Sequence, residues 1–292
     1  MLIPLQWVGL FATAVVWIVM FALGLMLGRE QIRAATQRRW VLAALVFAVS
    51  VPVPVLAVLL VKAFALTGAV AAGIVLMSIS PGAPVALRRA LDAGGDRAFA
   101  PALHLAIVAL AVITVPLALV ILDWIFAKDF AVTPLNIAEQ VFFAQLLPMA
   151  IGAAVRAWRP AFAAKLEAPL SRIGSALLAV MGLMVLVDLP GLWKAVGFAP
   201  LLAGCGLTVC ALAIGTAFAG RDAAVRPAAA VAVAMRNPGL ALVIATVNRM
   251  PPDVTAAVIG YALGLGLTII AFLMWRRRAT KVASRSSRTP AA

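Results

Sequence analysis

The chain has 292 residues, of which 65% are hydrophobic and 12% are charged, and its formal net charge is +14. Soluble domains are only about half apolar, so this composition excludes an ordinary soluble protein and predicts an all-α polytopic membrane protein. The positive charge does not indicate a nucleic-acid-binding protein, because the basic residues gather in loops on one side of the predicted spans.

Nine apolar segments each approach the length of about 20 residues that a helix needs to cross a bilayer. In chain order they cover residues 7–27, 40–62, 66–87, 98–122, 134–155, 170–188, 196–219, 227–248 and 254–275. The loops between them are too short to separate domains. We therefore expect one transmembrane domain over residues 1–277, followed by a basic, disordered cytoplasmic tail over residues 278–292.

The third and eighth spans each contain a proline–glycine pair, Pro81-Gly82 and Pro238-Gly239. Proline removes a backbone donor and clashes with the preceding turn, and glycine adds backbone freedom. Opened backbone survives inside a membrane only where it is buried in protein or lines a cavity. Interrupted helices at corresponding places in two halves of a chain point to the binding site of a secondary transporter.

The two interrupted spans also indicate an internal repeat. If each half has five helices and the first half lacks its opening helix, the third span corresponds to the eighth. Five helix steps separate them, so the two spans run in opposite directions across the membrane. This arrangement is typical of the inverted repeats of secondary transporters.

Most of the 24 lysine and arginine residues lie in the loops after the first, third, fifth and seventh spans and in the C-terminal tail. The loops on the other side contain Lys62, Lys128, Lys194 and Arg249. The positive-inside rule then predicts a protein of a plasma (bacterial inner) membrane with its N-terminus outside and its C-terminus in the cytoplasm. The basic tail fits this topology, or contact with anionic lipid.

Three stretches carry a family resemblance. Residues 20–27, Met-Phe-Ala-Leu-Gly-Leu-Met-Leu, are similar to an early Met-Phe-x-x-Gly-Leu segment, and Ser80-Pro81-Gly82 stands in place of a Cys-Pro-Gly-Gly turn. Residues 232–241, Ala-Val-Ala-Met-Arg-Asn-Pro-Gly-Leu-Ala, are similar to Glu-Val-Gly-Met-Gln-Asn-Ser-Gly-Leu-Ala. In these motifs and in helix order, the chain resembles the bile acid:sodium symporter family, which includes nine-helix members that lack the first helix.

The resemblance implies a core domain, in which two broken helices cross at mid-membrane, and a flatter panel domain, with the substrate bound between them. We expect the core in the spans over residues 66–122 and 196–275, and the panel in the spans over residues 7–62 and 134–188. The expected partners are a small organic anion and the lipid bilayer.

The sodium ligands that the resemblance implies do not transfer to this chain. The glutamate of the second crossing helix corresponds to Ala232 and its glutamine to Arg236, while the Ser-Asn after the first turn corresponds to Ala86-Leu87. A following Ser/Thr-rich helix keeps only Thr114 as a polar residue.

A sodium ion would want about six oxygen ligands, by analogy with other hard cations. Backbone carbonyls near Ala83 and Val233 would supply some of them, but no carboxylate lies nearby in sequence. We therefore expect no cofactor and no metal-ligating side chains.

An arginine two residues before Pro238 is unusual, because a charge at mid-bilayer costs about 3 kcal/mol on insertion scales. One interpretation makes Arg236 a fixed cation that stands where a sodium ion sits in relatives and holds the two unwound helix ends. In a second interpretation, Arg236 binds an anionic substrate through its bidentate fork. In a third interpretation, Arg236 has only a structural role and forms a salt bridge or caps carbonyl groups.

The remaining polar residues of the spans leave fewer alternatives. Asn237 either bridges the opened backbone or contacts substrate. Ser78 and Ser80 either satisfy freed carbonyls, which is the commoner role, or contact solute. We interpret His104 as a hydrogen-bonded histidine and Glu139 as an interfacial carboxylate rather than as proton relays. The candidate substrate- or ion-binding residues are Ser78, Ser80, Pro81, Gly82, Thr114, Arg236, Asn237, Pro238 and Gly239.

The sequence contains no His-Glu-x-x-His, Gly-x-Ser-x-Gly or Walker motif, which argues against an enzyme and against direct use of ATP. We expect a secondary transporter of a small organic anion that works by alternating access, without the usual side-chain ligands for sodium coupling. The alternative is a transport-incompetent membrane sensor or receptor that retains the fold. A sensor would bind solute without moving it.

Overall fold

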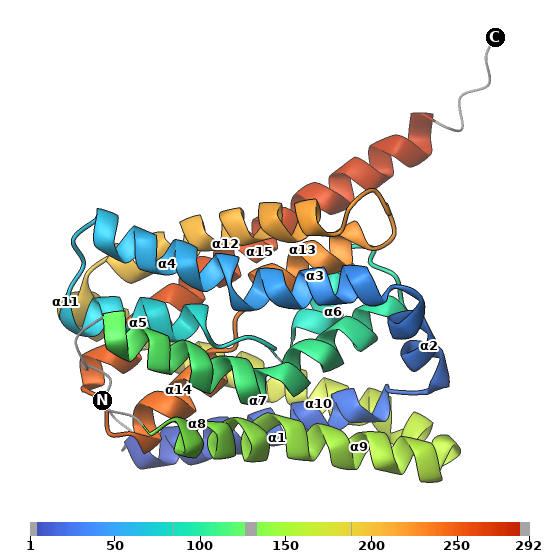
Figure 1. The fold of residues 1–292 in the computed structure, drawn as a ribbon, viewed down its shortest axis with the longest axis horizontal. Helices are drawn as coiled ribbons and strands as arrows, with labels where there is room; N and C mark the ends of the chain where they lie inside the picture. Colours follow the sequence, from blue (N-terminus) through green and yellow to red (C-terminus); the bar gives the residue numbers. More distant parts are fainter. Residues whose placement is uncertain (1–4, 84, 126–132, 188, 287–292) are drawn as a thin grey trace.

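The computed structural model describes residues 5–83, 85–125, 133–187 and 189–286, and every secondary-structure element in these ranges is a helix (Figure 1). The elements in chain order are α1 (Leu5–Leu25), α2 (Arg29–Gln37), α3 (Arg39–Ser50), α4 (Pro52–Ala63), α5 (Gly68–Ser78), α6 (Ala86–Asp92), α7 (Phe99–Ile125), α8 (Pro134–Val141), the π-helix η1 (Phe142–Leu146), α9 (Leu147–Trp158), α10 (Pro160–Val187), α11 (Leu189–Val196), α12 (Ala199–Phe218), α13 (Arg226–Ala234), α14 (Pro238–Val247) and α15 (Pro252–Ser286).

Six segments of the described chain are long and apolar enough to cross a membrane. They are Arg39–Ala63, Phe99–Leu122, Pro134–Trp158, Ala199–Phe218, Arg226–Val247 and Pro252–Ala279. A seventh is added if α1 and α2, which meet at an angle of 83°, are counted together. The protein is therefore an integral membrane protein with six to seven candidate spans among the described residues.

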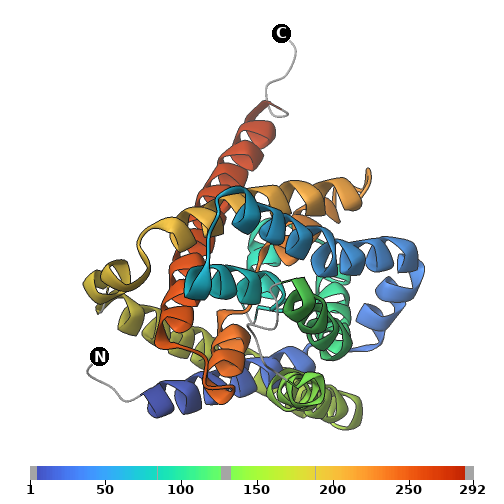
Figure 2. The same ribbon diagram turned by 60° about the vertical axis from the view of Figure 1, so that its left-hand side comes forward.

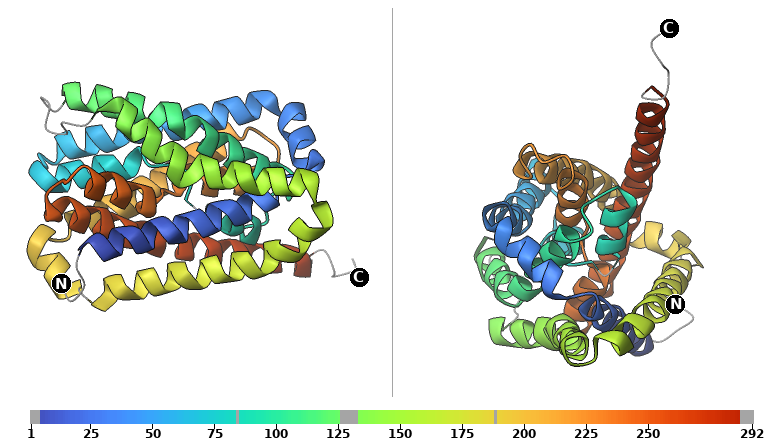
Figure 3. Two further views of the ribbon diagram at one scale, coloured as in Figure 1. Left: turned by 90° about the horizontal axis from the view of Figure 1, so that it is seen from below. Right: turned by 90° about the vertical axis from the view of Figure 1, so that its right-hand side faces the viewer.

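The helices form two layers that differ in size. The smaller layer contains α1, the continuous stretch α8–η1–α9, and α10, with α1 packed between α9 and α10 (Figure 3, left). The larger layer contains α3 to α7 and α12 to α15. The two layers meet where α7 packs on α8 and where α14 packs on α1 (Figure 2).

The span over residues 40–62 differs from our expectation. We expected it in the panel with the first span, but α3 and α4 pack against α5, α7, α12 and α13 in the larger layer. The reason is α2, an unexpected helix that leaves α1 at 83°. This turn carries the chain away from the smaller layer, so two spans that are consecutive in sequence lie in different layers.

Within the smaller layer, α1 and α9 approach closely through a pair of glycines. A Cβ atom on Gly24 would collide with the backbone oxygen of Met149, and one on Gly152 would collide with that of Phe21. Small residues let membrane helices pack backbone against backbone. This contact explains the glycine in the stretch over residues 20–27.

Both predicted interruptions are present in the larger layer. The helix α5 ends at Ser78 and α6 begins at Ala86, while α13 ends at Ala234 and α14 begins at Pro238. The span formed by α13 and α14 is the most enclosed, because 94% of its most apolar stretch is buried, against 33–44% in the other five candidate spans. An interrupted span therefore lies at the centre of the molecule.

The C-terminal segment differs from the expected disordered tail over residues 278–292. The helix α15 continues to Ser286 and extends well beyond the bundle (Figure 1). No proline or glycine interrupts residues 276–286, and adding residues to a formed helix is easier than nucleating one. Residues 287–292 lie outside the described part of the chain.

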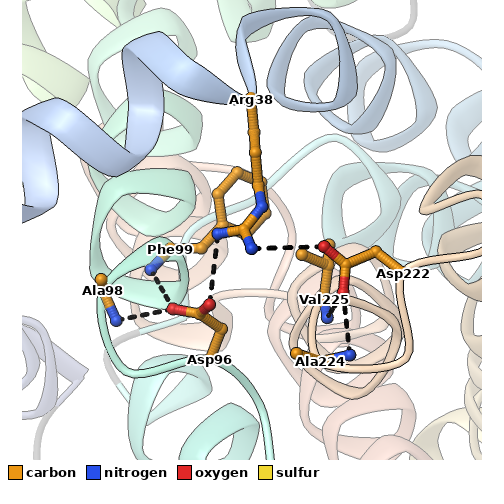
Figure 4. Close-up of polar contacts among 7 residues, drawn as sticks. All are labelled: Arg38, Asp96, Ala98, Phe99, Asp222, Ala224 and Val225. Atoms are coloured by element: carbon orange, nitrogen blue, oxygen red, sulfur yellow. Dashed lines mark hydrogen bonds and ion pairs between the residues drawn. The ribbon is translucent and has the colours of Figure 1, made fainter.

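At one end of the bundle, Arg38 joins three connecting segments (Figure 4). Its Nη1 lies 3.2 Å from Oδ2 of Asp96, in the connection between α6 and α7, and its Nη2 lies 3.3 Å from Oδ2 of Asp222, in the connection between α12 and α13. Its Cζ lies 5.7 Å from the centre of the Phe99 ring. We call Arg38, Asp96 and Asp222 the Arg38 cluster.

The two aspartates of the Arg38 cluster are held by local backbone groups. Oδ1 of Asp96 accepts hydrogen bonds of 2.8 Å from the N–H groups of Ala98 and Phe99, at the start of α7. Oδ1 of Asp222 accepts a 3.0 Å bond from the N–H group of Ala224. The N–H group of Asp96 in turn donates to the carbonyl oxygen of Ala224 at 3.0 Å, so the two connections are joined directly.

Candidate substrate site at the two interrupted spans

The two interruptions meet, and Asn237 is the residue that joins them. We call residues 79–83, 85 and 235–237 the junction. The backbone N–H group of Asn237 donates to the carbonyl oxygen of Ser80 at 2.7 Å, and its Nδ2 donates to the carbonyl oxygen of Gly82 at 3.3 Å. Its Oδ1 accepts a 3.1 Å bond from the N–H group of Leu240 and so caps α14. Asn237 thus bridges the opened backbone, the first of its two expected roles.

The serines of the first interruption are used within their own segment. The hydroxyl of Ser78 donates to the carbonyl oxygen of Val75, and that of Ser80 donates to the carbonyl oxygen of Leu76, each at 2.7 Å. Both side chains are fully buried. The two hydroxyl groups therefore satisfy carbonyl groups in the last turn of α5.

Gly82 has a conformation and surroundings that favour glycine. Its φ is +76°, in the left-handed region that residues with a Cβ rarely adopt. A Cβ atom there would lie 2.7 Å from Cγ2 of Val108 and 3.2 Å from Oε1 of Gln145. The glycine after Pro81 therefore lets the first interruption turn and lets its neighbours pack closely.

Arg236 lies in the interior of the larger layer and is only 1% exposed. Its Nη2 donates to the carbonyl oxygen of Val233 at 2.8 Å, near the C-terminus of α13, and its Nη1 donates to the carbonyl oxygen of Val49 at 3.3 Å. Its Nε has no hydrogen-bond partner, and no acidic side chain forms an ion pair with Arg236, within the described residues.

Both carbonyl groups that Arg236 binds lie at helix discontinuities. Val233 is in the last turn of α13, where a helix leaves carbonyl groups without backbone partners. Val49 lies beside the boundary at which α3 ends at Ser50 and α4 begins at Pro52. A guanidinium, which has five N–H donors, suits such exposed oxygens.

A pocket of about 200 Å³ opens beside the junction. Residues 235–239 line it on one side, Ala83, Val85 and Arg89 on another, and apolar residues of α15 complete the wall. The pocket therefore contains Arg236, Asn237, Pro238 and Gly239 of the predicted site. Among the described lining residues the charged ones are Arg236 and Arg89, and no acidic residue is present.

Four residues of the predicted site lie at the first interruption but do not line the pocket, namely Ser78, Ser80, Pro81 and Gly82. Three other residues that the sequence singled out do not line it either. Thr114 is half-buried in α7 and does not line it. His104, also in α7, is buried, and its Nε2 has no hydrogen-bond partner among the described residues, which differs from the hydrogen-bonded histidine that we expected. Glu139 is exposed in α8.

Sequence reasoning missed Gln145. It lies in η1, is fully buried, and its Oε1 accepts a 3.2 Å hydrogen bond from Nδ2 of Asn237. It therefore connects the smaller layer to the junction. The available signal was a single amide side chain in the apolar run Phe-Phe-Ala-Gln-Leu-Leu, since a polar residue inside a membrane span usually has a function.

Comparison with known families agrees with this arrangement. The profile of the Sodium Bile acid symporter family matches residues 13–190, a range that includes the first interruption and Gln145. A comparison with curated proteins gave no match. Members of the matched family are membrane transporters and not enzymes. Because the match covers more than half of the chain, the protein belongs to the sodium bile acid symporter family.

Proposed function

We propose that this transporter moves a small organic anion by alternating access, and that Arg236 provides a fixed positive charge at the junction in place of a coupling cation. The buried guanidinium carries this proposal, because it donates to the carbonyl oxygens of Val233 and Val49 and has no acidic partner among the described residues. Carbonyl oxygens are ligands of hard cations, and the Val233 region is where we expected backbone ligands for sodium.

The surroundings of the fixed charge favour an anionic solute. Arg236 and Arg89 line the pocket, although Nη1 of Arg89 also lies 3.3 Å from Oδ2 of Asp92, which offsets part of its charge. The ten-residue helix α14 begins at Pro238, on the pocket wall. Helix N-termini carry partial positive charge and attract anions.

The hydrogen bonds of Arg236 favour the fixed-cation role over direct binding of substrate by a bidentate fork. Its Nη1 and Nη2 each donate to a different carbonyl group, so a carboxylate would have to share the guanidinium with these carbonyls and use its remaining donors, which include the Nε–H without a partner among the described residues. A structural cap makes the same contacts. The two roles differ in their effect on transport.

The contacts of the Arg38 cluster support one feature of the proposed nine-span topology, the placement of three loops on the same side of the membrane. Arg38, Asp96 and Asp222 lie in three loops that the positive-inside rule places on one side, and they are bonded to one another. Even numbers of spans must separate such loops. The nine spans would be the six candidates together with α1, the interrupted pair α5–α6, and α10.

The two layers suggest how the transporter works. In this proposal the smaller layer is the panel, the larger layer is the core, and the two interrupted spans form the inverted repeat. Substrate binds at the pocket beside the junction, where α1 contributes Val16 from the smaller layer. Rocking of one layer against the other would then expose the pocket to each side in turn.

Reconstitution of the full chain in proteoliposomes tests the function. We expect uptake of at least one anion from a test set of labelled carboxylates and sulfonates that includes a bile acid. Binding of a test anion, measured as a thermal shift in detergent, without any uptake would instead identify a sensor or receptor that retains the fold.

Two variants test the role of Arg236. We expect Arg236→Ala to lose uptake because the fixed charge is removed. Adding Ala232→Glu to that variant would restore a carboxylate near the Val233 carbonyl, so uptake should return and require sodium. Normal uptake by Arg236→Ala would show that the guanidinium is only structural.

A further inference from the structure

Two glutamines of the smaller layer contact the two ends of α14. Oε1 of Gln145 accepts from Nδ2 of Asn237, which caps the N-terminus of α14, and Oε1 of Gln140 accepts from Nδ2 of Asn248, which follows its C-terminus, at 3.2 and 3.3 Å. The two Gln–Asn pairs have the same chemistry. They therefore provide a matched comparison within one molecule.

The π-helix η1 explains how both glutamines reach α14. In a regular α-helix, residues five apart point in different directions, because one turn takes 3.6 residues. The i→i+5 bonding of a π turn accommodates one extra residue, so Gln140 and Gln145 come onto the same face. Single π turns inside membrane and soluble helices are frequent at functional sites.

The two pairs differ in how well the glutamine is satisfied. Gln145 is fully buried, and its Nε2 has no hydrogen-bond partner within the described residues, whereas Gln140 is only partly buried. A buried amide group without partners for its N–H donors is unfavourable. Asn237 uses the Oε1 end of the amide, whereas no described residue uses its N–H donors, so these donors point to a partner that is bound in another state of the protein.

The neighbours of Gln145 indicate what that partner is. Its Oε1 contacts Asn237, which lines the pocket, and lies close to Gly82, where a Cβ atom would come within 3.2 Å of it. Gln145 is not itself a lining residue, but its uncharged N–H donors are one residue removed from a pocket whose charged lining residues in the described chain are arginines. Such donors match the oxygens of a carboxylate or sulfonate.

We propose that Gln145 is a solute-binding residue of the smaller layer, whose side-chain NH₂ group donates to an anionic oxygen of the transported solute at the junction. This inference rests on the proposed function and adds a contact from the second layer. Arg236 supplies charge from the larger layer, and Gln145 supplies directed hydrogen bonds from the smaller one. Solute bound to both layers would respond to their relative movement.

The test compares the variants Gln145→Met and Gln140→Met. The solute is the carboxylate or sulfonate of the test set that the wild-type protein takes up fastest. We expect Gln145→Met to raise the KM for uptake about tenfold, the effect of losing a hydrogen bond to a charged group, in addition to any loss of thermal stability from removing the acceptor of Asn237 Nδ2. Gln140→Met should change the KM by less than about twofold. Gln145→Glu, which keeps an acceptor for Asn237 and repels an anion, should raise the KM further than Gln145→Met.

Each outcome decides between the solute and a structural role. An unchanged KM in Gln145→Met would mean that Nε2 does not bind the solute and is satisfied inside the protein, by an ordered water for example. This result would overturn the inference while leaving the proposed function intact. If a variant is too unstable for reconstitution, the thermal shift produced by the same anion in detergent replaces the KM, and a shift equal to that of the wild type overturns the inference. Absence of both uptake and binding by the wild-type protein would overturn the proposed function as well.

Discussion

Arg236 and Arg38 each join segments that are distant in sequence, but they do so with different partners. Arg236 is 1% exposed and donates to two backbone carbonyl oxygens, with no acidic partner among the described residues. The side chain of Arg38 is 32% exposed and lies between the carboxylates of Asp96 and Asp222. The buried charge of Arg236 therefore has no carboxylate beside it among the described residues, whereas the charge of Arg38, near the surface, is paired with two carboxylates.

Under the proposed function, this difference separates a charge that serves transport from one that joins loops. A partly exposed ion pair contributes about 0.2–1 kcal/mol and is screened by salt, so the Arg38 cluster is an ordinary means of joining three loops. A charge inside a membrane-spanning region costs about 3 kcal/mol on insertion scales, and the carbonyl contacts of Arg236 offset only part of that cost. We therefore expect loss of Arg236 to affect transport and loss of Arg38 to affect stability.

The largest expected effect follows from Arg236→Met, which keeps a long side chain but removes the charge. Uptake should fall by about a hundredfold, because the variant loses the charge-assisted hydrogen bonds to Val233 and Val49, and a loss of about 3 kcal/mol corresponds to two factors of ten in an equilibrium constant. Arg38→Met is the matched control and should retain uptake within a factor of about three. Initial uptake rates in proteoliposomes measure both, and similar losses in the two variants would remove the distinction.

The two interruptions and the buried arginine could be predicted from the sequence, but the way in which they pack together could not. The prolines and glycines predicted both interruptions, because Pro81 and Pro238 cannot continue helical hydrogen bonding whatever surrounds them. Arg236 was identified from the cost of burying its charge. These inferences needed only the chemical properties of proline, glycine and arginine, and no knowledge of which residues lie next to them in the fold.

Features that depend on three-dimensional packing were not predictable in this way. The placement of α3 and α4 in the larger layer follows from the 83° turn after α1, which no local motif announces. The contact of Gln145 with the junction depends on the π turn of η1. A hydrophobic periodicity based on 3.6 residues per turn gives the wrong face for any residue beyond such a turn.

A second prediction concerns the backbone at the junction. Gly82→Ala should destabilise the protein by about 1–3 kcal/mol, because alanine is strained at a φ of +76° and its Cβ would lie 2.7 Å from Cγ2 of Val108. Gly206→Ala is the control, since a Cβ there meets nothing within 4 Å. Thermal unfolding in detergent compares them, and an equally stable Gly82→Ala would mean that the first interruption tolerates rearrangement.

A smaller effect on stability is expected at the Arg38 cluster. Arg38→Ala should lower the free energy of unfolding by about 1 kcal/mol, through loss of two partly exposed ion pairs and of the contact with the Phe99 ring. The difference from the wild type should shrink in about 1 M salt, where screening is strong. A loss that is large and independent of salt would show that Arg38 resembles Arg236 more than we infer.

The smallest effect is a pH dependence of the Arg38 cluster. Burial raises the pKa of Asp96, but the N–H groups of Phe99 and Ala98 and the guanidinium of Arg38 lower it more, so its pKa lies below the ordinary value of 3.8. The resulting stabilisation is present above that value and is lost as the pH falls through the lower, folded-state pKa. Asp96→Asn should therefore lose less stability than the wild type between about pH 5 and about pH 2, and thermal unfolding across this range measures the difference.

The sodium dependence of uptake tests the central claim most directly. Proteoliposomes with the wild-type protein should take up the preferred test anion equally fast with an inward sodium gradient and with sodium replaced by choline. We expect this because Arg236 already supplies the positive charge at the junction. Uptake that requires the sodium gradient would contradict this account, since the guanidinium would then not stand in for the coupling cation.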